Sequence, residues 1–131
     1  MQRDESSEAV EAFRSYARAF QSLDARGVAE HFAEPALLIS PQGVVALPTR
    51  AAVADEYGRL LAGLPAQGYA RTEFSPLAGR RLSDDLALVT GAGTWKTTSG
   101  EELQRFGLTY TLRRTGQTWQ IVVAAIHDPG A

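Results

Sequence analysis

The chain has 131 residues, and 13 Lys and Arg against 15 Asp and Glu give it a formal net charge of -2. Because the two signs are interspersed, no basic stripe favours nucleic acid and no polybasic run favours an anionic membrane. The lack of cysteine excludes disulfides, thiolate metal ligands and a cysteine nucleophile. With neither a signal-peptide pattern nor an apolar run of membrane-spanning length, the sequence predicts one soluble, cytoplasmic domain over residues 1–131.

The first third of the chain predicts two helices. Apolar residues recur at steps of three and four from residue 8 to about residue 23, which is typical of an amphipathic helix. Residues 1–7, ahead of this pattern, are expected to be frayed or disordered. Asp24 is the expected cap of a second, shorter helix, in which Phe32 faces inward and which Pro35 ends.

A hairpin and a third helix are expected next. The runs "ALLIS" and "VVAL", separated by "PQG", predict two short paired strands. Thr49 is the expected cap of the third helix, which Gly63 and Pro65 close. Its apolar stripe consists of Val53, Tyr57, Leu60, Leu61 and Leu64.

The second half of the chain predicts strands. "YARTEFS", "LALVTGAGTWKT", "LQRFGLTYTLRR" and "WQIVVAAIH" are β-type runs joined by the turn clusters "SDD", "TSGE" and "TGQT". Helices followed by consecutive antiparallel strands favour an α+β domain, in which the helices cover one face of a curved sheet.

The last two strands have an inner and an outer face. Strict alternation puts Phe106, Leu108, Tyr110 and Leu112 toward the helices. In the final strand the same alternation groups Trp119, Ile121, Val123, Ala125 and His127 on one face. The residues expected on the outer face are Thr109, Thr111, Val122, Ala124 and Ile126. Such an exposed apolar strip is typical of an interface, so we expect a homodimer through the outer sheet face.

The order of these elements resembles that of the nuclear transport factor 2-like superfamily. Three stretches carry the likeness: "EHFAEPALLISPQG" after two helices, "TRAAVADEY" at the start of the third, and "WQI" at the start of the last strand. The resemblance spans about residues 10–127 and implies a cone-shaped, cystatin-like fold. In that fold a curved antiparallel sheet wraps around three N-terminal helices and encloses a pocket. Members include ketosteroid isomerases, SnoaL-like polyketide cyclases and scytalone dehydratase, and many members dimerise.

The ketosteroid isomerase branch permits a comparison of single residues. Tyr16 is followed after 15 residues by Phe-Ala and then by Pro41, which is the spacing of that branch. The resemblance implies Tyr16 as an oxyanion donor, Tyr57 as its supporting partner, and Tyr110 in place of a protonated Asp that is the second donor. Ser40 falls where the branch has its general base, and a serine cannot shuttle a proton at neutral pH.

His127 is the candidate proton carrier. The resemblance puts Val123, Ala125 and His127 on the pocket side of the last strand, with His127 at the mouth. We therefore expect His127, Tyr16 and Tyr110 as catalytic residues. The alternative for His127 is a strand-end residue that caps backbone groups or meets a partner subunit.

The expected ligand contacts are Tyr57, Ser40, Trp95, Phe106, Val123 and Ala125. Trp95 shares a face with the two glycines of "GAG", which leave room for a ligand or a helix or allow the sheet to curve. His31, at the edge of a helical stripe, is interpreted as structural or exposed. The sequence holds no zinc-protease, P-loop, dinucleotide-binding or nucleophile-elbow motif, so we expect neither a metal nor a cofactor.

Three functions are compatible with this sequence. One is a pocket that binds a modest hydrophobic or aromatic molecule without altering it. Another is a cofactor-independent isomerase, cyclase or lyase that works next to a carbonyl, with His127 moving the proton and tyrosines stabilising the oxyanion. The third is a dimeric association module whose pocket is vestigial.

Overall fold

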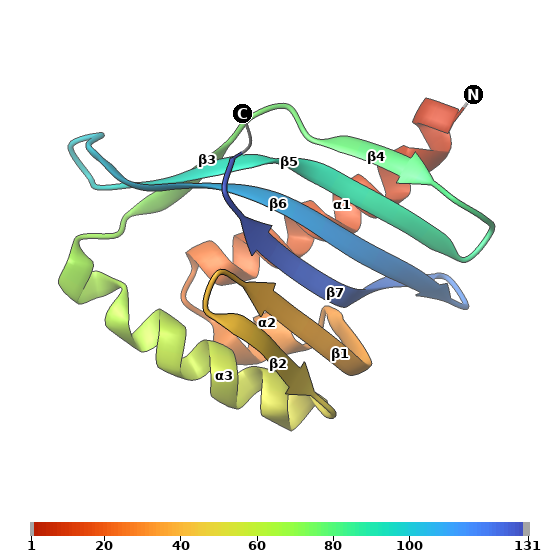
Figure 1. The fold of residues 1–131 in the computed structure, drawn as a ribbon, viewed down its shortest axis with the longest axis horizontal. Helices are drawn as coiled ribbons and strands as arrows, with labels where there is room; N and C mark the ends of the chain where they lie inside the picture. The colour runs from red at the N-terminus through yellow and green to blue at the C-terminus, as the bar shows by residue number, and fades with distance from the viewer. Residues whose placement is uncertain (1, 130–131) are drawn as a thin grey trace.

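The computed structural model describes residues 2–129, with side chains from Glu8 onward. One curved sheet of seven strands forms the body of the fold, and Figure 1 shows α1 (Gln2–Gln21) crossing behind it. α2 (Ala25–Ala29) and α3 (Arg50–Gly63), followed by the short helix η1 (Pro65–Gln67), lie at one side of the sheet. The predicted α+β architecture of a curved sheet with three helices is therefore confirmed.

The sheet is mixed rather than wholly antiparallel. Its strands are β1 (Phe32–Ser40), β2 (Gly43–Leu47), β3 (Arg71–Phe74), β4 (Ala78–Arg81), β5 (Leu86–Lys96), β6 (Glu102–Thr115) and β7 (Thr118–His127). The order is β2-β1-β7-β6-β5-β3, and β4 also pairs with β5. All neighbouring strands pair antiparallel except β1 and β7, which are parallel. β7 follows β6 through a tight turn and lies between β6 and β1 in the sheet. The sequence pattern did not predict β4, whose "AGRR" lacks an apolar row.

The helix boundaries differ from the predicted ones at two places. α1 begins at Gln2, ahead of the expected start. The frayed state predicted for residues 1–7 stays a prediction, because Met1 and the side chains of residues 2–7 lie outside the described part. Asp24 caps α2 as predicted, accepting a hydrogen bond from the Gly27 amide at 3.0 Å. However, Phe32 begins β1 instead of ending the helix, since it pairs with Ile121 of β7.

The predicted hairpin and third helix are confirmed. Ser40 pairs with Gly43 across the turn between β1 and β2. Thr49 caps α3 by accepting a hydrogen bond from the Ala52 amide at 3.1 Å. Both features depend on interactions between residues that are close in the sequence, so a local sequence pattern can predict them.

A β-bulge in β7 reverses the predicted faces of its second half. Leu112 of β6 pairs with Ile121, but the next pair is Thr111 with Val123, so Val122 is an extra residue without a partner. An extra residue shifts the alternation by one position. Ala124 is consequently fully buried, whereas His127 is exposed.

This bulge corrects the expected outer strip. Ala124 and Ile126 pair with the inward residues Tyr110 and Leu108 and therefore face the helices. The outward residues of β7 are the partners of Thr111, Thr109 and Gly107, namely Val123, Ala125 and His127. Thr109 and Thr111 lie on the outer face as predicted.

Aromatic side chains fill the space between α1 and the sheet. Phe13 of α1 is 1% exposed, and its ring meets those of Tyr16, Phe74 and Tyr110 at centroid distances of 4.9–5.5 Å. Each such ring removes a large apolar area from water. In the described part of the chain, no helix is both long and apolar enough to cross a membrane.

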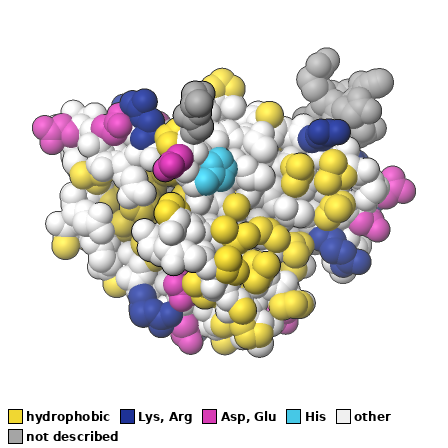
Figure 2. Space-filling model, viewed as in Figure 1, with side chains coloured by type: hydrophobic (Ala, Val, Ile, Leu, Met, Phe, Trp, Pro, Cys, Tyr) yellow, Lys and Arg dark blue, Asp and Glu magenta, His cyan; other side chains and the backbone are white. Residues whose placement is uncertain are grey.

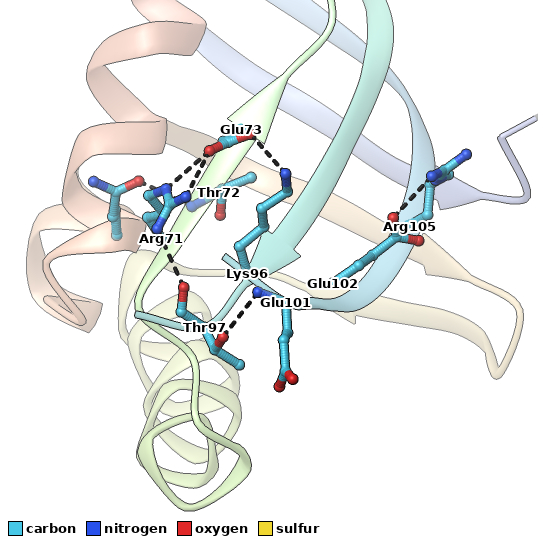
Figure 3. A network of polar contacts seen from close by, with 9 residues as sticks. Arg71, Thr72, Glu73, Lys96, Thr97, Glu101, Glu102 and Arg105 are labelled. Carbon is cyan, nitrogen blue, oxygen red and sulfur yellow. Dashed lines mark hydrogen bonds and ion pairs between the residues drawn. The ribbon is translucent and has the colours of Figure 1, made fainter. Parts of the chain in front are cut away.

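The edge of the sheet at β3 carries an ionic network (Figure 3). The Glu73 carboxylate accepts from Arg71 at 2.9 Å and pairs with Lys96 at 3.1 Å, so hydrogen bonds from both cations lower the pKa of this carboxyl. Charged side chains on an edge strand discourage pairing with another sheet. We therefore interpret the network as protection of an open edge.

Candidate functional site

A pocket of about 560 Å³ lies between the concave face of the sheet, α1 and α3. This volume falls within the range of roughly 300–1,000 Å³ that is usual for small-molecule sites. Its walls are mainly aromatic and aliphatic, and the larger apolar side chains are Phe13, Phe20, Leu38, Leu60, Phe74, Trp95, Phe106, Leu108 and Ile126. The pocket therefore suits a largely hydrophobic guest.

Three tyrosines from three elements bring their hydroxyl groups together in this pocket. Tyr16 of α1 lies 2.9 Å from the hydroxyl of Tyr110 on β6 and 3.5 Å from that of Tyr57 on α3. The second contact is longer than an ordinary hydroxyl hydrogen bond and is therefore weak. All three residues are at most 5% exposed. The predicted association of Tyr16, Tyr57 and Tyr110 is thus present in the structure.

The tyrosine cluster has more hydroxyl protons than hydroxyl contacts within 3.5 Å. Three hydroxyls carry three protons, whereas the two contacts between them use two at most. Burial raises the pKa of Tyr16 and Tyr110 well above the usual range and raises that of Tyr57 to about 12. All three are consequently neutral at physiological pH, and the cluster can donate a hydrogen bond to an acceptor in the pocket.

Polar side chains gather at the more exposed part of the lining. Gln42, Gln67 and Gln104 are exposed, and Glu56 of α3 keeps 31% of its side chain exposed. Glu56 is the one carboxylate among the described lining residues, and none of those residues is Lys, Arg or His. Arg59, one turn along α3, donates to Glu56 at 2.8 Å.

Ser40 lines the pocket as predicted, but its hydroxyl belongs to the β1–β2 turn. It donates to the Gln42 side chain at 3.0 Å and accepts from the Gln42 amide at 3.2 Å. Serine commonly bonds to nearby backbone groups in turns of this kind. These hydrogen bonds show that Ser40 stabilises the turn, and they give no support for a role in proton transfer.

His127 does not line the pocket, and the prediction that Val123, Ala125 and His127 face it is wrong. The bulge at Val122 puts all three on the outer face. The His127 ring lies against Gly107, and its Nδ1 is 2.7 Å from the Asp128 carbonyl. Because a carbonyl only accepts, Nδ1 carries the proton, and a neutral ring then accepts from the Thr109 hydroxyl at 3.0 Å.

Trp95 and Phe106 line the pocket as predicted. A Cβ atom on Gly93 would lie 2.5 Å from the Phe106 ring, so this glycine gives room to an aromatic side chain of the neighbouring strand. The sequence left room for a ligand, room for a helix and sheet curvature open as reasons for this glycine, and the structure shows that the space next to it is taken by the Phe106 ring.

His31 has a structural position outside the pocket. Its Nδ1 donates to the Gly27 carbonyl at 2.8 Å, and its Nε2 accepts from the Ser15 hydroxyl at 2.8 Å. These bonds join α1 to the end of α2, in agreement with the structural interpretation. Within the described residues, no group of three or more His, Cys, Asp or Glu side chains is placed to hold a metal ion.

Several lining residues were not predicted. Phe13 and Phe20 belong to the α1 stripe that the sequence shows, but a stripe does not distinguish a packed core from a pocket wall. Ile126 was assigned to the wrong face because of the bulge. Glu56 had one signal, its place next to Tyr57 on a helix whose apolar stripe faces the sheet.

Solved structures of similar fold are numerous. An NTF2-like protein with a cystatin-like fold from Novosphingobium aromaticivorans is 22% identical and superimposes with a TM-score of 0.76 over 92% of this chain and 79% of that one. A protein from Streptomyces avermitilis, provisionally named a dehydratase of the NTF2-like family, is 16% identical with a TM-score of 0.75 over 98% of both chains. At these identities the likeness shows the fold alone.

The sequence itself assigns the family. No curated protein matches it. Residues 5–129, which include every element that lines the pocket, match the family described as NTF2-like protein (DUF6841). The chain therefore belongs to this NTF2-like family.

Proposed function

We propose that the protein binds a largely hydrophobic or aromatic small molecule that carries a hydrogen-bond acceptor, such as a carbonyl group. The observation that carries this proposal is the spare hydroxyl proton of the tyrosine cluster inside an apolar pocket of about 560 Å³. Inside an apolar pocket, a hydrogen bond from this cluster to a ligand acceptor adds affinity and favours ligands that carry such an acceptor.

Binding is favoured over the acid–base chemistry expected with His127. That chemistry needs a proton carrier within reach of the substrate. His127 lies on the other face of the sheet, and the Ser40 hydroxyl is engaged in its turn. The tyrosines can stabilise an oxyanion, as such chemistry requires. The residue expected to transfer the proton, His127, does not reach the pocket.

A matched pair of ligands tests the proposal. Trp95 lines the pocket and Trp119 does not, so Trp95 fluorescence in a Trp119→Phe background reports occupancy. We expect 2-acetonaphthone to bind, and the triple variant Tyr16→Phe, Tyr57→Phe, Tyr110→Phe to weaken it about tenfold. All three hydroxyls are removed together because a single substitution would leave a remaining hydroxyl buried with one hydrogen-bond partner fewer.

The hydrocarbon 2-ethylnaphthalene is the control. It has no acceptor, so the triple variant should bind it at least as well as the parent protein does. Failure of the ketone to bind, or an equal loss for ketone and hydrocarbon, would contradict the proposal.

We also propose that a second copy of the chain covers the outer face of the sheet. Leu37 and Ile39 of β1 pair with Val123 and Ala125 of β7, and Figure 2 shows hydrophobic side chains gathered over this part of the surface. Leu37 is 38% exposed. A strip of this kind can pair with itself across a two-fold axis.

Light scattering at micromolar concentration tests the association. We expect a dimeric mass, and we expect Leu37→Asp to shift it to the monomer. Leu82, which is 45% exposed in the turn between β4 and β5, supplies the control Leu82→Asp. A monomeric parent protein would contradict this proposal.

A further inference from the structure

The charges around the pocket are unevenly distributed. Among the described residues that line it, Glu56 is the one carboxylate, and no Lys, Arg or His is present. An anionic ligand would leave water for a pocket that offers it no cation and one repelling carboxylate. Such a transfer is unfavourable unless a partner charge compensates for it.

Glu56 lies where a ligand can reach it. Its side chain is 31% exposed, while Tyr57, the next residue on α3, is buried at the cluster. Burial is the main cause of the raised pKa of Tyr57, and the negative charge of Glu56 adds the smallest of the contributions. The carboxylate is therefore part of the pocket lining while remaining open to solvent.

The ion pair of Glu56 does not remove this charge from the pocket. Arg59 lies 2.8 Å from the carboxylate, but its own side chain is 73% exposed. Exposed pairs of this kind contribute little to stability, so a ligand cation can compete with Arg59. The arginine itself is not among the lining residues.

We propose that Glu56 makes the pocket selective for ligands that carry a protonated amine at the end opposite their hydrogen-bond acceptor. This inference rests on the proposed function, because the tyrosine cluster receives the acceptor end. The aromatic lining adds to the selectivity, since a cation close to a ring such as that of Trp95 is attracted to its face. The ligand class is thus an amino-substituted aromatic or aliphatic carbonyl compound, and carboxylates are rejected.

Three ketones of matched shape test the selectivity. They are 2-acetonaphthones with an aminomethyl, a methyl or a carboxylate group at position 6, measured by Trp95 fluorescence in the Trp119→Phe background. We expect affinity to fall in that order, with about tenfold or more between the amine and the carboxylate. Glu56→Gln should reduce this ratio to about twofold while leaving the affinity for the methyl compound unchanged.

Two variants sharpen the result. Arg59→Gln removes the competing cation, so it should strengthen binding of the amine about two- to fivefold and leave the methyl compound unaffected. Glu73→Gln is the matched control, because Glu73 is an ion-paired carboxylate on β3 outside the pocket lining. It should leave the ratio unchanged.

The outcomes separate the two proposals. If the methyl compound binds but charge has no effect, or if Glu56→Gln leaves the ratio intact, the inference about Glu56 is overturned and the proposed function stands. If none of the three ketones binds, both are overturned.

Discussion

The two faces of the β6–β7 pair differ in how completely their polar side chains are hydrogen-bonded. On the inner face, the cluster that contains Tyr110 and Tyr16 has three hydroxyl protons but two hydroxyl contacts within 3.5 Å. On the outer face, both ring nitrogens of His127 are engaged, one by the Asp128 carbonyl and the other by Thr109. An ionisable residue in a strand is therefore a weak sign of function until its hydrogen bonds have been counted. The spare donor, rather than the titratable imidazole, marks the candidate site.

The faces should differ most in their contribution to stability. Phe13→Ala removes a ring that is 1% exposed and packed against three other rings, so we expect a loss of about 3–5 kcal/mol. Val123→Ala, at a half-buried position of the outer face, should cost about 1 kcal/mol or less. Urea unfolding measures both, and equal losses would mean that the outer face is as tightly packed as the inner one.

Alkaline pH should act on the inner face alone. Burial raises the pKa of Tyr57 from 10.0 to about 12 and also raises those of Tyr16 and Tyr110 well above the usual value. Folding favours the neutral phenols, so their contribution to stability is complete below about pH 10 and is lost as the pH rises through the folded pKa values. Tyrosinate absorbance should thus appear together with unfolding at about pH 12 or above. Ionisation of all tyrosines in a still folded protein would contradict the burial of the cluster.

The outer face should respond to a single methyl group at Gly107. A Cβ atom there would lie 2.6 Å from the His127 ring and 2.7 Å from the Asp128 carbonyl oxygen, so Gly107→Ala should cost about 1–2 kcal/mol. Adding His127→Ala should recover part of this loss, because the ring contact disappears and the carbonyl contact remains. A double-mutant cycle by urea unfolding measures the coupling, and strict additivity would show that the ring does not lie on Gly107.

The smallest expected effect concerns pH and His127. No His lines the pocket among the described residues, so the affinity for 2-acetonaphthone should be constant between about pH 5.5 and 7.5, where a free imidazole titrates. His127→Phe should leave that affinity unchanged within about twofold. Fluorescence titration across this range provides the measurement. A pH-dependent affinity that disappears in His127→Phe would contradict this prediction and show that His127 affects ligand binding.

Local patterns in the sequence predicted much of the fold. Asp24 and Thr49 cap their helices as expected, because capping needs only a side-chain oxygen near an unpaired amide. The inward row of β6 from Phe106 to Leu112 also agrees, since the extra residue of the bulge lies on β7 and leaves the alternation of β6 unchanged. The meeting of Tyr16, Tyr57 and Tyr110 came from the family resemblance, because their separation along the chain carries no local signal.

By itself, the sequence determined the α+β class, the helix caps and which residues of β6 face inward, since each follows from contacts between near neighbours. Only the tertiary structure decided that β7 lies parallel to β1 and contains a bulge at Val122. It thereby placed Ile126 in the pocket and His127 outside it. The physical reason is that a strand with apolar residues on both faces can alternate in either phase, so its pairing with neighbouring strands, and not its own pattern, selects the phase.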